Sequence, residues 1–123
     1  MFSTSDTIVA IATPPGRGAM GVVRVSGPAA RRVAGAILTA RRPLAPRHAT
    51  LTRVRRSCED AASNGERESP NQAVSDQVIA TYFEHPASYT GEDIVEISAH
   101  GSPVVLHQIL KAAMHAGARL AEP

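Results

Sequence analysis

Two charged residues interrupt stretches of the sequence that are otherwise apolar. Arg24 lies within residues 21–25, and Glu96 lies within residues 94–97. An unpaired ionised group inside an apolar strand is costly, so each charge needs a partner. In a purely structural role, the two residues form a salt bridge or are exposed on the open face of a sheet. In a functional role, they mark a polar ligand site on that face. In a ligand site, the carboxylate would accept two parallel N–H bonds from a guanidine-like heterocycle, and the arginine would bind a carboxylate or phosphate.

A glycine-rich segment, Gly16–Gly21, follows a predicted strand and matches the pattern G-x-G-x-x-G. A dinucleotide-binding fold requires a helix next and an acid about 20 residues later. Here residues 22–25 predict a strand, and Arg41 and Arg42 stand where the acid should be. The Lys and Ser/Thr of a P-loop are also missing. The segment, with Arg17, is therefore either a tight connection between two strands or a cradle for an anion.

The histidines and the cysteine give weaker signals. His100 precedes a glycine at the entry to a predicted helix, where it either contacts a ligand or caps the turn. His107 and His115 share with Lys111 a stripe spaced by four residues, which predicts a solvated surface. Cys58 has acidic neighbours that disfavour a thiolate. No nucleophile, base and orienting group can be assembled, so we predict no catalytic set and no metal site.

Length and composition exclude several classes of protein. The 123 residues suffice for one domain. A single cysteine excludes a disulfide scaffold and a zinc site with two or more Cys ligands. No apolar run reaches the roughly 18 to 20 residues of a membrane span, and the first residues lack the features of a signal peptide. We therefore expect a cytoplasmic protein.

The net charge of +2 conceals an uneven distribution. Residues 1–58 contain ten Arg and one acid, for a net charge of +9, whereas residues 59–123 carry −7. The basic half is either a nucleic-acid footprint or pairs with the acidic half within or between subunits. The arginines are scattered and lack interleaved aromatic residues, which favours pairing.

The pattern of apolar residues predicts the elements that position these groups. Strands are expected at residues 7–13, 21–25, 50–56, 77–83 and 94–97. Helices are expected after Ser26-Gly27-Pro28 and Ser102-Pro103. Their apolar stripes comprise Ala30, Val33, Ala34, Ile37 and Leu38 in the first helix, and Leu106, Ile109, Leu110, Ala113 and Met114 in the second. The polar segment 57–76 predicts a mobile surface loop. The order β-β-α-β-β-β-α predicts the α+β class, with helices packed on a mixed, mainly antiparallel sheet.

Two stretches of the sequence resemble a known family. Residues 6–18 and 21–27 are similar to the opening of the tRNA modification GTPases called MnmE or TrmE. Residues 88–96, followed by His100-Gly101-x-Pro103-Val104-Val105, resemble that family's second signature. Order and spacing agree along almost the whole chain, so the joint match is far more specific than the glycine pattern.

The resemblance implies that residues 1–123 form the family's N-terminal domain, which binds a tetrahydrofolate derivative (5-formyl- or 5,10-methylene-tetrahydrofolate) and holds two subunits together. Arg24 and Glu96 match the family's folate-contacting Arg and Glu, and Arg17 and His100 are further candidates. The full-length family members work with an MnmG-type flavoprotein on carbon 5 of the wobble uridine of certain tRNAs.

The family's helical and GTPase domains have no counterpart in these 123 residues, so we expect no GTP hydrolysis by this chain. The sequence ends at Pro123, where the family continues into a segment that contributes a folate-contacting lysine, so we expect an incomplete folate site. Two other functions stay open: a structural dimerisation domain without a ligand, and an Arg-rich module that binds tRNA.

Overall fold

A computed structural model describes residues 6–13, 18–40, 42–55, 74–86, 88 and 91–121. In chain order its elements are β1 (Ile8–Ile11), β2 (Gly18–Ser26), α1 (Ala30–Ile37), β3 (Thr50–Arg55), β4 (Val74–Phe83), β5 (Ile94–Gly101), α3 (Pro103–His115) and β6 (Arg119–Leu120). Within the described ranges, neither helix is both long and apolar enough to cross a lipid bilayer.

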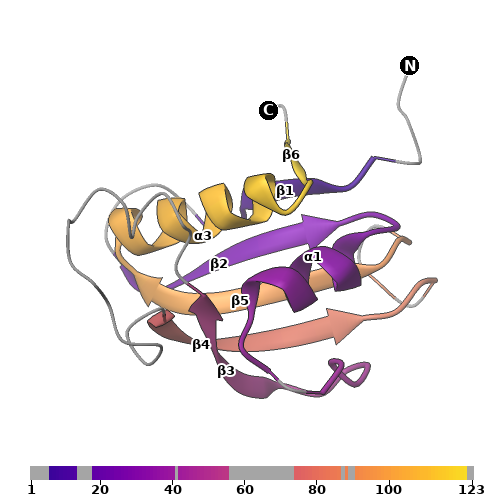
Figure 1. Ribbon diagram of the computed structural model, residues 1–123, viewed down its shortest axis with the longest axis horizontal. Helices are drawn as coiled ribbons and strands as arrows, with labels where there is room; N and C mark the ends of the chain where they lie inside the picture. Colours follow the sequence, from indigo (N-terminus) through magenta and orange to yellow (C-terminus); the bar gives the residue numbers. More distant parts are fainter. Residues whose placement is uncertain are drawn as a thin grey trace.

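The strands form a single mixed sheet in the order β3-β4-β5-β2-β1-β6. All neighbouring strands run antiparallel except β1 and β6, which are parallel. Both helices lie across one face of this sheet (Figure 1). The predicted α+β class, with a mainly antiparallel sheet, is therefore confirmed, and a parallel dinucleotide-binding sheet is excluded.

The core lies between the sheet and the two helices. Alternate residues of the central strands, such as Val23 and Val25 on β2 and Val95 and Ile97 on β5, are fully buried. Because side chains alternate between the faces of a strand, the residues between them point to the other face, which neither helix covers. We call this the open face.

The helices bear out most of the predicted stripes. All five residues predicted for the first helix are buried, although Leu38 follows the last residue of α1. On α3 the prediction is wrong for Met114, which is 42% exposed, while Ala112 is buried. The buried arc of α3 is therefore centred on Ile109 and Ala113, and Met114 lies beyond its edge.

Several strands extend beyond their predicted bounds. β2 begins at Gly18, so the described part of the glycine-rich segment is strand, while residues 14–17 lie outside the described residues. β4 begins at Val74, so the end of the predicted 57–76 loop is strand. The rest of that loop, 57–73, lies outside the described residues. The sequence analysis missed β6, because its two residues are strand only through pairing with β1.

Two glycines are required by close packing. A Cβ at Gly21 would lie 2.6 Å from Leu106 Cδ1, so this position lets α3 approach β2. Gly27, at the turn from β2 to α1, has φ +138°, and its Cβ would lie 2.5 Å from the carbonyl oxygen of Asp6. Gly35 on α1 differs, since a Cβ there would meet no atom within 4 Å.

The same substitution at two of these glycines should have opposite effects. Gly35→Ala should raise the free energy of unfolding by about 0.5–1 kcal/mol, because alanine is the better helix former. Gly27→Ala should lower it by more than about 1 kcal/mol, because an L-residue is strained at that φ. Urea denaturation of both variants measures the two changes. Equal effects at both positions would contradict the assigned backbone conformation.

Candidate functional site

Arg24 and Glu96 form an ion pair in the middle of the sheet. They are directly opposite each other in the antiparallel register of β2 and β5. Arg24 donates from Nε and Nη2 to Glu96 Oε1, at 3.1 and 2.8 Å. Their side chains are 32% and 29% exposed. An ion pair this accessible contributes at most about 1 kcal/mol to stability, so the fold does not depend on it.

Short side chains lie beside the pair in the same row of the sheet. Thr81 on β4 is opposite Glu96, and Ala10 on β1 is opposite Arg24, so these four residues form one row across the open face. The next residues along the two strands on this face are Val22 and Ser98 on one side, and Ser26 and the fully buried Ile94 on the other. A flat ring could therefore approach the pair over Val22 and Ser98, whereas Ile94 bounds the pair on the other side.

The other two predicted site residues are placed differently. His100 is exposed on the open face, paired with Met20. It lies four residues beyond Glu96 on β5, about 13 Å along the strand. The structure therefore brings His100 to the same face but not into contact with the pair. Arg17 lies outside the described residues.

A second carboxylate, Glu92, lies close to the same row and was missed in the sequence analysis. Ser26, two residues after Arg24 on the same face, donates from Oγ to Glu92 Oε2 at 3.4 Å. The only sequence signal for Glu92 was its place in the second signature, immediately before Asp93. The described site thus contains one guanidinium and two carboxylates.

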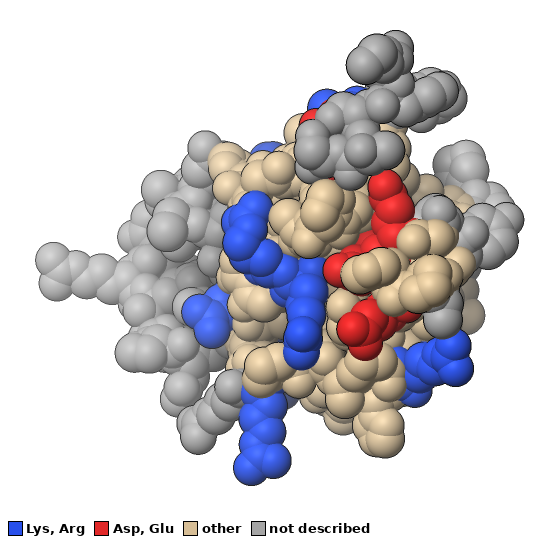
Figure 2. All heavy atoms as spheres, turned by 90° about the vertical axis from the view of Figure 1, so that its right-hand side faces the viewer, with Lys and Arg blue, Asp and Glu red and all other residues tan. Residues whose placement is uncertain are grey.

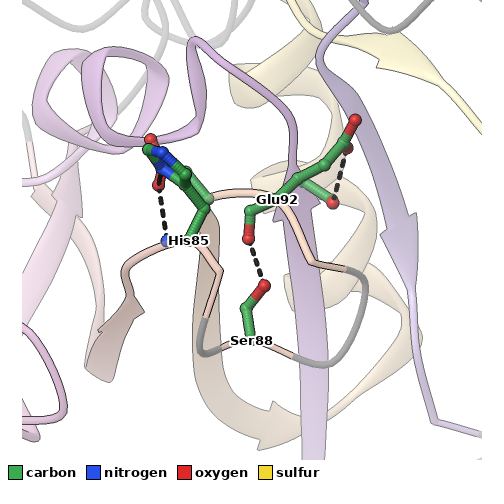
Figure 3. Close-up of polar contacts among 5 residues, drawn as sticks. His85, Ser88 and Glu92 are labelled. Atoms are coloured by element: carbon green, nitrogen blue, oxygen red, sulfur yellow. Dashed lines mark hydrogen bonds and ion pairs between the residues drawn. The ribbon is translucent and has the colours of Figure 1, made fainter.

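The loop between β4 and β5 is held by hydrogen bonds across its base (Figure 3). Asp93 Oδ1 accepts from the backbone N–H of His85 and contacts His85 Nδ1, both at 2.9 Å. The Ser88 hydroxyl donates to the carbonyl of Glu92. These contacts fix the start of β5 and therefore the position of Glu96.

The comparisons with known proteins match this chain over nearly its full length. Residues 7–123 match the family model described as the GTP-binding protein TrmE N-terminus. The chain belongs to this family.

Curated relatives agree with this assignment. The tRNA modification GTPase MnmE of Legionella pneumophila (strain Paris) is 51% identical over 118 residues, which cover 96% of this chain and 23% of the relative. The MnmE proteins of Nitrosospira multiformis and Koribacter versatilis are 46% and 48% identical, each over 99% of this chain, which spans 24% and 25% of their lengths. The chain thus corresponds to the TrmE N-terminal domain and spans about a quarter of these proteins.

The charges of this TrmE N-terminal domain pair partly between the two halves of the sequence. Arg24 pairs with Glu96, and Asp6 with Arg119 at 3.2 Å. Both pairs join a residue before position 59 to one after it, in line with the pairing favoured from the sequence. His107 and His115 are exposed on α3, as predicted. Among the described residues, no three His, Cys, Asp or Glu side chains are grouped so that they could hold a metal ion.

The pKa values at the base of the β4–β5 loop are perturbed by the loop contacts. The hydrogen bond to Asp93, and then its charge, raise the pKa of His85 above 6.5. The backbone hydrogen bond from His85 is the largest cause that lowers the pKa of Asp93 below 3.8. Burial raises the pKa of Tyr82 above 10.0, and the charge of Asp93 adds to this.

The directions of these pKa shifts determine the pH range in which the contact between His85 and Asp93 contributes most to stability. Because the pKa of His85 is raised, its contribution to stability is complete below pH 6.5 and is lost as pH rises through the higher folded-state value. Because the pKa of Asp93 is lowered, its contribution is lost only as pH falls through that lowered value.

An NMR titration of the His85 ring should therefore give a pKa above 6.5. Asp93→Asn should lower it toward 6.5, because it removes the charge of Asp93 and leaves only a neutral acceptor for the hydrogen bond. Glu84→Gln is the matched control, since the charge of Glu84 is the smallest cause. A larger decrease with Glu84→Gln than with Asp93→Asn would contradict this assignment.

Proposed function

We propose that this domain binds a tetrahydrofolate derivative on the open face of its sheet, with Glu96 and Arg24 as the central contacts. The observation that carries the proposal is the partly exposed ion pair in the middle of the sheet face that neither helix covers. These are also the two positions at which the family resemblance implies folate contacts. Membership of the TrmE N-terminal family supports the proposal.

Glu96 has an oxygen available for such a ligand. Both hydrogen bonds that Arg24 donates to it use Oε1, and the contacts of Glu96 within the described chain leave Oε2 without a donor. The edge of a pterin ring carries a ring N–H beside an amino group. These donors suit a carboxylate, because two parallel N–H bonds to its two oxygens are the geometry it accepts best. One of them would displace a bond from Arg24.

Arg24 would then turn part of its guanidinium toward the ligand. Folates carry carboxylates on their glutamate tail and carbonyl groups on the pterin and the one-carbon unit. A guanidinium binds such planar oxygen acceptors well, because it has five N–H donors in a fixed plane. The exchange costs little, since the ion pair that opens is partly solvated.

We also propose that two copies of the domain associate through this face. Three large apolar side chains are exposed on it: Met20 at 54%, Leu51 at 66% and Ile79 at 40%. Their register places all three on the same side of the sheet as the ion pair. A second copy that covers them would also exclude water from a bound folate, so ligand and partner would support each other.

Within a longer protein, this module would supply the folate-dependent part of a tRNA modification reaction. We propose that it serves an enzyme that works with an MnmG-type flavoprotein on carbon 5 of a wobble uridine, with the folate as the one-carbon source. The relatives are tRNA modification GTPases, which supports this context. Catalysis would then require groups outside the described site.

Isothermal titration with 5-formyltetrahydrofolate tests the site. Arg24→Ala and Glu96→Ala should each weaken binding about tenfold or more, because hydrogen bonds to charged groups contribute about 1.5–3 kcal/mol. Lys111→Gln is the matched control, since Lys111 is exposed on α3, on the side of the sheet that the helices cover.

Binding that survives both substitutions, or that falls as much in Lys111→Gln, would exclude this site. Light scattering on the same samples gives the oligomeric state. A dimer without affinity for folate would instead favour the structural dimerisation domain.

A further inference from the structure

A hollow of about 660 Å³ lies on the helix side of the sheet, away from the folate site proposed above. It is formed by α1, the segment that follows it, and the ends of β4 and β5. Its inner part is apolar, with Leu38, Leu44 and Tyr82 all buried. Its lining includes the guanidinium-bearing residues Arg31, Arg32 and Arg42. Figure 2 shows Lys and Arg side chains next to a group of acidic side chains at the end of the molecule where α1 and β5 begin.

Two of the three arginines are held in place. The guanidinium of Arg31 lies over the ring of Tyr82, 5.1 Å from its centroid, and Nη2 donates to the carbonyl of Leu44 at 3.4 Å. Arg32 donates from Nη1 to the carbonyl of Ala116 at 3.3 Å. A guanidinium has five N–H donors, so each keeps most of its donors for another acceptor. Ordering before binding lowers the entropic cost of binding a ligand.

The positive charge of the hollow is not neutralised within the described part of the chain. There, none of the three arginines is ion-paired with a carboxylate. Among the lining residues, Asp93 carries one negative charge against the three positive charges of the arginines, and its Oδ1 accepts from the backbone N–H of His85. Three like charges over one concavity repel one another, and apolar walls strengthen their field toward an anion. An anionic ligand would relieve this repulsion.

We propose that this hollow is a binding site for a phosphate group. Guanidinium groups bind phosphate oxygens through paired N–H donors, and three of them suit a group that carries more charge than one carboxylate. The phosphate can belong to a small phosphate ester or to the backbone of an RNA. Because the hollow and the Arg24–Glu96 pair lie on opposite faces of the sheet, the two sites bind their ligands independently.

Gly35 gives a direct way to probe the hollow. It lines the hollow from the exposed side of α1, and a Cβ there would meet no atom within 4 Å. Gly35→Glu places a carboxylate among the arginines and should repel a phosphate. Gly35→Ala occupies the same position without charge and serves as its control.

The experiment measures binding of three probes to the 123-residue chain: inorganic phosphate, adenosine monophosphate, and a short RNA without a terminal phosphate. Arg31→Gln combined with Arg42→Gln, and separately Gly35→Glu, should weaken binding about tenfold or more. Arg42 makes no polar contact within the described residues, so Arg42→Gln alone disturbs no such contact. It should weaken binding less than the double substitution does. Gly35→Ala and Arg53→Gln should bind as the unmodified chain does, since Arg53 lies on the open face.

Binding of adenosine monophosphate assigns the site to a small phosphate ester, and binding of the RNA alone assigns it to a nucleic-acid backbone. Either result supports the proposal when Gly35→Glu and the double arginine substitution weaken the binding and the two control variants do not. The proposal is overturned if no probe binds. It is also overturned if Arg53→Gln weakens binding as much as the double substitution, because the attraction would then be a general effect of charge. Thermal unfolding of each variant confirms that it is folded.

Discussion

The hydrogen-bond register between β2 and β5 determines the two surfaces of this domain. It places Val23 and Val25 with Val95 and Ile97 on the face that the helices cover. The same register sets Arg24 opposite Glu96 on the face that they leave open. A slip of one residue would reverse the faces of a strand, burying a charge and exposing a valine row. The packing of the core therefore fixes the position of the ion pair, although the pair itself contributes little to stability.

Much of the fold could be predicted from the sequence because its signals are local. The stripe from Ala30 to Leu38 is set by helical periodicity, and the strands by β-branched residues. Features that depend on distant partners could not be predicted. β6 is strand only because β1 is beside it, and Met114 is exposed because the neighbours of α3 set its orientation.

The candidate site, too, could be predicted from the sequence only where its signals are local. The unusual charges within apolar strands singled out Arg24 and Glu96, but their direct contact joins residues 72 positions apart and depends on register. Glu92 was missed because its link to Ser26 arises only once the loop closes. The excess of arginine before position 59 was visible in the sequence, whereas the gathering of three of them around one hollow required the turn from α1 into the following segment.

We propose that the open face around Arg24 and Glu96 is the folate site. The most direct test follows backbone amide shifts in the isotope-labelled chain as 5-formyltetrahydrofolate is added. We expect the largest shifts in the row that contains Thr81, Glu96 and Arg24, with small changes at Gly35 on the opposite side of the sheet. Shifts centred on α1 and its hollow, or none at all, would contradict it.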